Sequence, residues 1–153
     1  MGLKKNSFRF GTVAAIFFTI LVTGGCGTAI RYSYDARTNF PELKTYQWAK
    51  SNIIYRQDSL LESNVRFLAD QDLGNKGLTK KEDKADLLVW MSYEYDYSGY
   101  SYQLRMVTLT ISRADNNEPV WRGTAVGDIR TDAASGDLKK AVEGILANFP
   151  PKG

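Results

Sequence analysis

The only cysteine of the sequence, Cys26, is the residue with the most specific chemistry. It follows two glycines and an apolar run over residues 10–22, and three basic residues precede that run. Such a basic segment, short apolar segment and small residues before a cleavage site are typical of a bacterial secretory signal. The run has 13 residues, which as a helix would span roughly 20 Å, less than the ~30 Å of a bilayer core.

This segment resembles the bacterial lipobox, with Thr23 where leucine is usual and Gly24 and Gly25 before the cysteine. The resemblance implies that residues 1–25 are removed and that Cys26, bound to diacylglycerol, becomes the first residue of the mature protein. An uncleaved anchor helix and a plain secretory signal with an incidental cysteine are the alternatives. Residue 27 is Gly rather than Asp, which favours the inner leaflet of the outer membrane, facing the periplasm.

Charge and composition exclude several classes of function. The net charge of +3 comes from the leader, and removal of residues 1–25 leaves 17 basic and 17 acidic side chains. The mature chain therefore lacks the basic excess that indicates nucleic-acid binding. The sequence has no histidine, so imidazole metal sites and Ser-His or Cys-His nucleophiles are excluded. We expect no catalytic residues, no metal and no cofactor.

Tyrosines are concentrated in one short stretch. Five lie within ten residues: Tyr93, Tyr95, Tyr97, Tyr100 and Tyr102. Tyrosine offers a large, rigid and amphipathic surface, so the cluster could bind a glycan or a peptide. The same residues could instead form cross-strand pairs that stabilise a hairpin. The sequence leaves both interpretations open.

Acidic residues also occur in small groups. Glu94 and Asp96 share one face of an expected strand, and carboxylates are ligands that Ca²⁺ prefers. Two ligands are too few for a site, so we interpret them as solvated surface residues. The group Asp128, Asp132 and Asp137 is interpreted as helix capping and surface charge.

Alternating and helical periodicities predict the elements that position these residues. Strands are expected over 30–36, 43–49, 86–97, 100–112 and 120–128, and helices over 60–73 and 138–149. Ser59 and Glu62 form a capping-box pattern at the first helix, and Ser135 or Asp132 could cap the second. The segment from Lys76 to Lys84 is expected to be a charged loop.

The resulting order, β-β-α-β-β-β-α, predicts an α+β fold. We expect an antiparallel sheet of about five strands with two helices packed on one face. Residues 26–30 form a lipidated tether in this interpretation, and residues 31–151 form a single domain.

A series of short motifs, in order along the chain, resembles domain-of-unknown-function family 4136. The motifs are Tyr34-Asp35, Phe40, Lys44-Thr45-Tyr46-Gln47-Trp48, Lys76-Gly77-Leu78, Ala85-Asp86-Leu87-Leu88-Val89, Trp121-Arg122-Gly123-Thr124-Ala125, Ala141-Val142, Ile145-Leu146 and Phe149-Pro150-Pro151. The family often has an acid where this chain has Ser112. The resemblance implies a small periplasm-facing lipoprotein of Gram-negative bacteria, with no established reaction. The matched aromatics Tyr46, Trp48 and Trp121 are expected in the core, Gly123 at a bulge or close contact, and Arg122 on a solvated face.

These observations predict a non-enzymatic binding or envelope-assembly module. It would be anchored at Cys26 to the membrane by lipid and would contact an envelope protein or peptidoglycan. The alternative is a lipoprotein that binds a glycan or a small hydrophobic molecule through its tyrosine-rich surface.

Overall fold

The computed structural model describes residues 27–50, 58–98, 101–132 and 134–151. Cys26 and Tyr100, together with the predicted leader, lie outside these residues. The described elements are β1 (Ala29–Tyr34), a 3₁₀ turn (Phe40–Glu42), β2 (Thr45–Trp48), α1 (Ser59–Asn75), β3 (Thr79–Lys80), β4 (Leu87–Ser98), β5 (Ser101–Arg113), β6 (Pro119–Ile129) and α2 (Asp137–Leu146).

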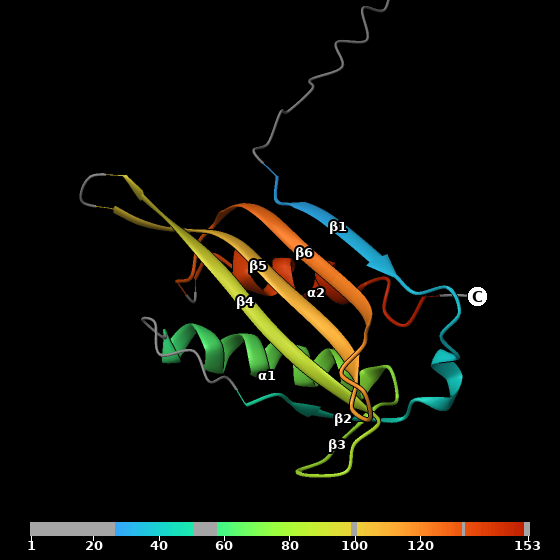
Figure 1. Ribbon diagram of the computed structural model, residues 1–153. Helices are drawn as coiled ribbons and strands as arrows, with labels where there is room; N and C mark the ends of the chain where they lie inside the picture. Colours follow the sequence, from blue (N-terminus) through green and yellow to red (C-terminus); the bar gives the residue numbers. More distant parts are fainter. Residues whose placement is uncertain (1–26, 51–57, 99–100, 133, 152–153) are drawn as a thin grey trace, which may run out of the picture.

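The strands form one sheet in the order β1-β6-β5-β4-β2-β3. The strands β4, β5 and β6 form the antiparallel meander that the alternating pattern predicts, and β1 pairs antiparallel with β6. The first two strands of the chain therefore lie far apart, because β1 forms one edge and β2 pairs with β4 near the other. The 3₁₀ turn lies in the segment that connects them (Figure 1).

The α+β class is confirmed, but the sheet differs in two details from the expectation. It has six strands, and β2 pairs in parallel with both β4 and β3. The strand β3 lies in the segment that we expected to be a charged loop. Its two residues are exposed, so they carry no alternating pattern. Backbone bonds join it to β2, from Thr79 N to Lys44 O (2.9 Å) and from Lys81 N, one residue beyond β3, to Tyr46 O (2.8 Å).

Both helices pack on the same face of the sheet, as predicted, and in Figure 1 they lie behind it. Each presents an apolar stripe with helical spacing to the core, formed in α1 by Leu61, Val65, Ala69 and Leu73 and in α2 by Leu138, Ala141, Val142, Ile145 and Leu146. Among the described helices, none is long and apolar enough to cross a membrane.

The ends of the two helices differ from the expectation at three points. The N-cap of α1 is Asp58 rather than Ser59, and its carboxylate accepts a hydrogen bond from Leu61 N at 2.9 Å. The N-cap position of α2 is Gly136, whose φ of 67° favours glycine. The helix α2 ends at Leu146, so Phe149 lies beyond it although it is buried. Proline cannot continue a helix, and here the chain turns before it reaches Pro150.

In the Trp-Arg-Gly motif of β6, the alternation of the strand correctly predicts which side chains are buried and which is exposed. Trp121 and Gly123 point into the core, and Arg122 between them is exposed. A Cβ atom on Gly123 would lie 2.2 Å from Trp121 Cη2 and 2.9 Å from Ile145 Cγ2, so only glycine leaves room for the indole. Trp121 in turn packs edge-on against Phe149, with ring centroids 5.3 Å apart. Tyr46 is also buried as expected, and Trp48 is partly buried at the margin of the core.

Candidate functional site

The tyrosine cluster lies where β4 and β5 approach their connecting turn. Its described rings form a continuous series of edge-to-face contacts: Tyr93 with Tyr95 at 5.9 Å, Tyr95 with Tyr102 at 5.2 Å, and Tyr97 with Tyr102 at 4.6 Å between centroids. Such pairs contribute ~0.5–1.5 kcal/mol each beyond the area they bury. The cluster therefore stabilises this end of the hairpin.

Two of these tyrosines also fix the start of α1. Tyr95 Oη donates to Asp58 Oδ2 at 2.6 Å, and Tyr93 Oη donates to Glu62 Oε1 at 3.1 Å. Tyr93 Oη also accepts from Asp58 N at 2.8 Å. Glu62 thus bonds a tyrosine, whereas the capping-box interpretation had it reach back to its own helix. The hydroxyls of Tyr93 and Tyr95 are committed to holding the helix.

Burial and the hydrogen bonds of this corner shift the pKa values of Tyr95 and Asp58 in opposite directions. Burial, then the hydrogen bond to Asp58, raises the pKa of Tyr95 well above its ordinary value. The backbone N–H of Leu61, followed by the Tyr95 hydroxyl, lowers the pKa of Asp58. At pH 7 the tyrosine is therefore neutral and the aspartate ionised, which is their ordinary state.

The outer members of the cluster differ from the inner pair in exposure. Tyr97 and Tyr102 are each 58 % exposed and form one small aromatic surface. The structure thus divides the predicted site: Tyr93 and Tyr95 contact α1, and Tyr97 and Tyr102 face solvent. Tyr100 and the lipid-attachment residue Cys26 lie outside the described residues.

A second surface, which the sequence did not single out, is the face of the sheet opposite the helices. We call this surface the open face and define it by residues from four strands: Arg31 and Ser33 of β1, Arg122 and Thr124 of β6, Thr108 and Thr110 of β5, and Trp90 and Ser92 of β4. Figure 1 views the sheet from this side, and neither helix covers it.

The residues of the open face lie in two rows that cross the strands. The first row runs Arg31, Thr124, Thr108, Ser92, and the second runs Ser33, Arg122, Thr110, Trp90. Thr108 and Thr124 share a hydrogen bond of 2.9 Å between their hydroxyls, and Arg122 Nε donates to Thr110 Oγ1 at 3.3 Å. Trp90 is 41 % exposed. Thr108 is buried, and the hydroxyls of the other residues share this surface with two guanidinium groups and one indole.

The two arginines of the open face are unusual among those that the structure describes. Within the described residues, neither Arg31 nor Arg122 forms an ion pair or stacks on an aromatic ring. The other described arginines do one or the other: Arg37 with Asp35, Arg66 over the Trp48 ring, Arg105 with Asp96 and Asp128, Arg113 with Asp115, and Arg130 with Asp137.

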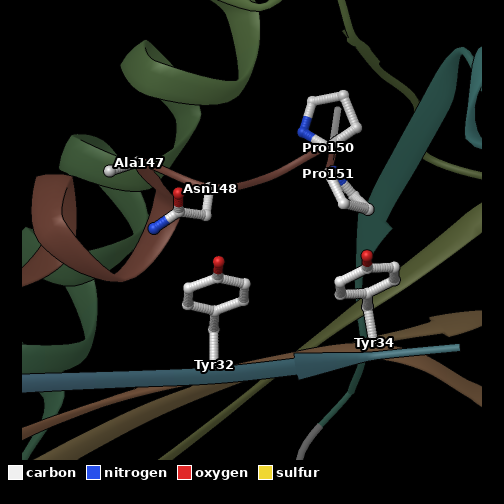
Figure 2. Close-up of a pocket in the computed structure, with 6 residues that line it drawn as sticks. All are labelled: Tyr32, Tyr34, Ala147, Asn148, Pro150 and Pro151. Atoms are coloured by element: carbon white, nitrogen blue, oxygen red, sulfur yellow. The ribbon is translucent and has the colours of Figure 1, made fainter. Parts of the chain in front are cut away.

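A small cleft lies at the edge of the sheet, between β1 and the segment that follows α2. Tyr32 and Tyr34 project from β1 toward Asn148 and Pro151 (Figure 2). The cleft has a volume of about 280 Å³. Tyr34 also packs edge-on against Phe40, with ring centroids 6.3 Å apart. The cleft is thus bounded on one side by a tyrosine that helps to cover the core.

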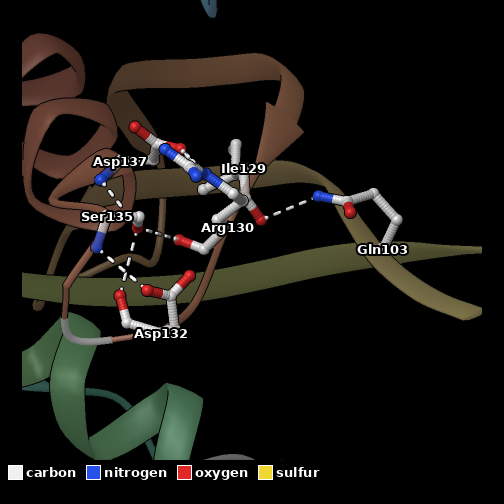
Figure 3. A network of polar contacts seen from close by, with 6 residues as sticks. All are labelled: Gln103, Ile129, Arg130, Asp132, Ser135 and Asp137. Atoms are coloured by element: carbon white, nitrogen blue, oxygen red, sulfur yellow. Dashed lines mark hydrogen bonds and ion pairs between the residues drawn. The ribbon is translucent and has the colours of Figure 1, made fainter.

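None of the three aspartates near α2 caps that helix, whose N-cap is Gly136, and two of them instead form contacts in the link between β6 and α2. Arg130 Nε lies 2.8 Å from Asp137 Oδ2, and Asp132 Oδ1 accepts from Ser135 N at 3.0 Å (Figure 3). Asp128 pairs with Arg105. Among the described residues there is no group of three or more acidic or thiol side chains that could hold a metal ion.

Two aspartates have structural roles that the sequence did not reveal. Asp86 Oδ2 accepts hydrogen bonds from Lys44 N, Thr45 N and Thr45 Oγ1 at 3.0, 2.9 and 2.7 Å. Asp70 Oδ1 accepts from Tyr46 Oη at 2.9 Å and from Trp48 Nε1 at 2.7 Å. The only sequence signal was that Asp86 belongs to one of the family motifs, and no pattern indicates a partner 41 residues away.

The fold and these surfaces define a small α+β domain with one helix-covered and one open sheet face. The chain belongs to the family described as Domain of unknown function (DUF4136), which matches residues 30–94 and 89–151. This membership confirms the resemblance seen in the motifs. No curated protein matches the sequence.

Solved structures of low sequence identity share the fold. A DUF4136 family protein from Bacteroides thetaiotaomicron is 16 % identical, with a TM-score of 0.60 over 80 % of this chain and 94 % of its own. A PDZ domain protein from Parabacteroides distasonis is 13 % identical, with a TM-score of 0.61; the match covers 82 % of this chain but only 36 % of that protein. A PelC dodecamer chain from Paraburkholderia phytofirmans is 17 % identical, with a TM-score of 0.52 over 78 % of this chain and 95 % of its own.

Proposed function

We propose that this DUF4136 protein is a non-enzymatic binding module of the bacterial cell envelope, anchored by lipid at Cys26. It is held at the inner leaflet of the outer membrane and faces the periplasm. Its open face is the surface that contacts an envelope component. The absence of histidine from the sequence supports a role in binding, because few side chains then titrate near neutral pH.

The observation that carries the proposal is the contrast between the two faces of the sheet. The helices cover one face with apolar side chains, while the other presents Arg31, Arg122 and Trp90 to solvent. Arginine and tryptophan are the side chains that contribute most to binding surfaces. Arginines with no acidic partner in the described part of the chain are available to a ligand.

Lipid attachment is tested by replacing Cys26 with serine in the full-length protein. Wild-type protein is expected to incorporate labelled palmitate and to sediment with outer membranes, and the Cys26→Ser variant is expected to do neither. A Cys26→Ser variant that still sediments with membranes would refute the lipid anchor and would favour an uncleaved apolar helix.

The binding surface is tested by photo-crosslinking in intact cells. A photoreactive amino acid is placed at Ser33 or Ser92 on the open face, and at Gln71 or Glu143 on the exposed side of the helices. Adducts are expected from the open-face positions and not from the helix positions. Adducts from Gln71 or Glu143 alone would show that the helical side is the binding surface.

A second candidate function uses the exposed part of the tyrosine cluster. Tyr97 and Tyr102 offer adjacent, solvent-facing rings, which suit a glycan or a small hydrophobic molecule. In the same crosslinking experiment, a photoreactive residue at position 97 would give adducts if this surface binds. Adducts at position 97 and none at Ser33 or Ser92 would favour this alternative over the open face.

A further inference from the structure

The arginines of the open face are close together although they carry the same charge. Arg31 lies opposite Thr124, and Arg122 lies two residues from Thr124 on the same strand. Diagonal neighbours of this kind have Cα atoms ~7–8 Å apart. Neither of the two rows contains an acid, and the acid on the same face of β4, Glu94, lies in the row beyond Ser92, opposite Met106 and three strands from Arg31. An arrangement of this kind favours an anion.

The side chain of Arg122 also reaches toward the aromatic residue of its row. Its Nε donates to Thr110 on β5, and Trp90 lies opposite Thr110 on the next strand, β4. Arg122 and Trp90 therefore lie on strands that are two spacings, ~10 Å, apart, with the Arg122 side chain directed from one strand toward the other. This spacing accommodates one sugar ring.

The remaining side chains of the rows determine which kind of anion fits. The hydroxyls of Thr110, Thr124, Ser92 and Ser33 surround the arginines and Trp90, whereas Thr108 is buried and bonds Thr124. Hydroxyls both donate and accept hydrogen bonds, as the hydroxyls of a saccharide do. A guanidinium binds a planar carboxylate through two parallel bonds, and an indole offers an apolar face for the C–H groups of a sugar.

Two other classes of partner fit this surface less well. The centre of a protein–protein interface is rich in apolar and aromatic side chains, whereas the two rows contain one aromatic residue among hydroxyls. Binding to anionic lipid generally uses a cluster of about four to eight basic residues, and the rows contain two.

We propose that the open face binds a saccharide chain whose sugar units carry carboxylates. Arg31 and Arg122 bind the carboxylate, Trp90 stacks on a sugar ring, and Thr110 and Thr124 bond ring hydroxyls. This inference rests on the proposed function, because it names the ligand class of the same surface.

The test measures binding of wild-type protein, held in a non-ionic detergent, to hexasaccharides of galacturonate, mannuronate and alternating glucuronate. Neutral hexasaccharides of matched length are the comparison. At least one uronate is expected to bind, with affinity that falls as salt rises, and the neutral chains are expected to bind at least tenfold more weakly. This comparison needs no variant, so it stands even where a substitution impairs folding.

Variants then locate the site. The pair Arg31→Gln and Arg122→Gln, and separately Trp90→Ala, are each expected to weaken uronate binding by about tenfold or more. Matched controls remove an arginine and an exposed aromatic elsewhere: Arg37→Gln, which is paired with Asp35, and Phe67→Ala on α1, which is 61 % exposed. Both controls are expected to retain wild-type affinity.

Failure of the saccharide inference can be distinguished from failure of the proposed function. Uronate binding that survives both open-face variants, or equal binding of the neutral chains, would overturn the inference. Binding only to purified peptidoglycan sacculi, or only to vesicles containing phosphatidylglycerol, would overturn it as well. In any of these cases, crosslinked adducts from Ser33 and Ser92 would leave the proposed function intact, and only the absence of such adducts would refute that function.

Discussion

Asp70 joins α1 to the outer strands of the sheet through both of its carboxylate oxygens. Its Oδ1 accepts from Tyr46 Oη and Trp48 Nε1, and its Oδ2 lies 2.8 Å from Lys80 Nζ of β3. Burial and the hydrogen bond to Asp70 raise the pKa of Tyr46 far above its ordinary value. The Asp70 carboxylate therefore accepts hydrogen bonds from a tyrosine hydroxyl and an indole N–H at the margin of the core.

Replacing Asp70 by alanine is expected to destabilise the protein by about 1.5–3 kcal/mol, because hydrogen bonds to a charged acceptor contribute about this much. Equilibrium urea unfolding followed by tryptophan fluorescence measures the change. The control is Gln71→Ala, since Gln71 is exposed on the same helix, and it is expected to leave stability nearly unchanged. Equal stability of the Asp70 and Gln71 variants would refute the role given to Asp70.

For single residues, the sequence predicts which side chains are buried better than it predicts which side chains are neighbours across strands. Alternation along β6 places Trp121 and Gly123 inside and Arg122 outside, because successive residues of a strand point to opposite faces. The same rule cannot show that Arg122 lies diagonal to Arg31, since that depends on the pairing of β1 with β6. The open face therefore became visible only in the structure.

Among the elements, the antiparallel meander, both helices and the strands β1 and β2 could be predicted, whereas the pairing of the outer strands and the short strand β3 could not. Sequential strands joined by short turns usually pair with each other, which covers β4, β5 and β6. The strand β2 instead pairs in parallel with β4 after the intervening helix α1. Asp86 secures that pairing through bonds to residues 44 and 45. Contacts across such a separation leave no periodic signal in either segment.

The packing of α2 on β6 depends on Gly123. Replacing this glycine by alanine is therefore expected to lower stability, whereas the same replacement at Gly74 is expected to raise it. Gly123→Ala places a methyl group against Trp121 and Ile145, and overpacking of this kind costs about 1–3 kcal/mol. Gly74→Ala in α1 meets no atom within 4 Å and is expected to stabilise the helix by about 1 kcal/mol. Thermal unfolding should show a lower Tm for the first variant and an equal or higher Tm for the second. A Gly123→Ala protein as stable as wild type would mean that the indole has room to move.

For the molecule as a whole, the sequence predicts the α+β class and the single covered face of the sheet. It does not predict that β1 and β2 lie toward opposite edges of the sheet, because neither strand encodes its neighbour. That separation matters for the proposed function. It brings Arg31 of β1 beside β6, so that the first strand after the predicted tether contributes to the open face.

The distribution of titratable groups predicts how the stability of the whole protein depends on pH. Without histidine, no side chain with an ordinary pKa titrates between about pH 5.5 and 8. Hydrogen bonds from Thr45 and from the Lys44 N–H lower the pKa of Asp86, and the N–H of Leu61 and the Tyr95 hydroxyl lower that of Asp58. A carboxylate whose pKa is lower in the folded state stabilises the protein above its unfolded pKa of ~3.9, and this contribution is lost as the pH falls through the folded value.

The Tm is therefore expected to be flat from pH 8 to 5.5 and to fall progressively below about pH 4. Calorimetry over this range measures it, and Asp86→Asn and Asp58→Asn should each lower the plateau while making the acid limb shallower. These substitutions keep the size of the side chain but remove the charge that the folded state favours. A Tm that changes between pH 5.5 and 8, or an acid limb unaltered in both variants, would show that other groups control the acid stability of the domain.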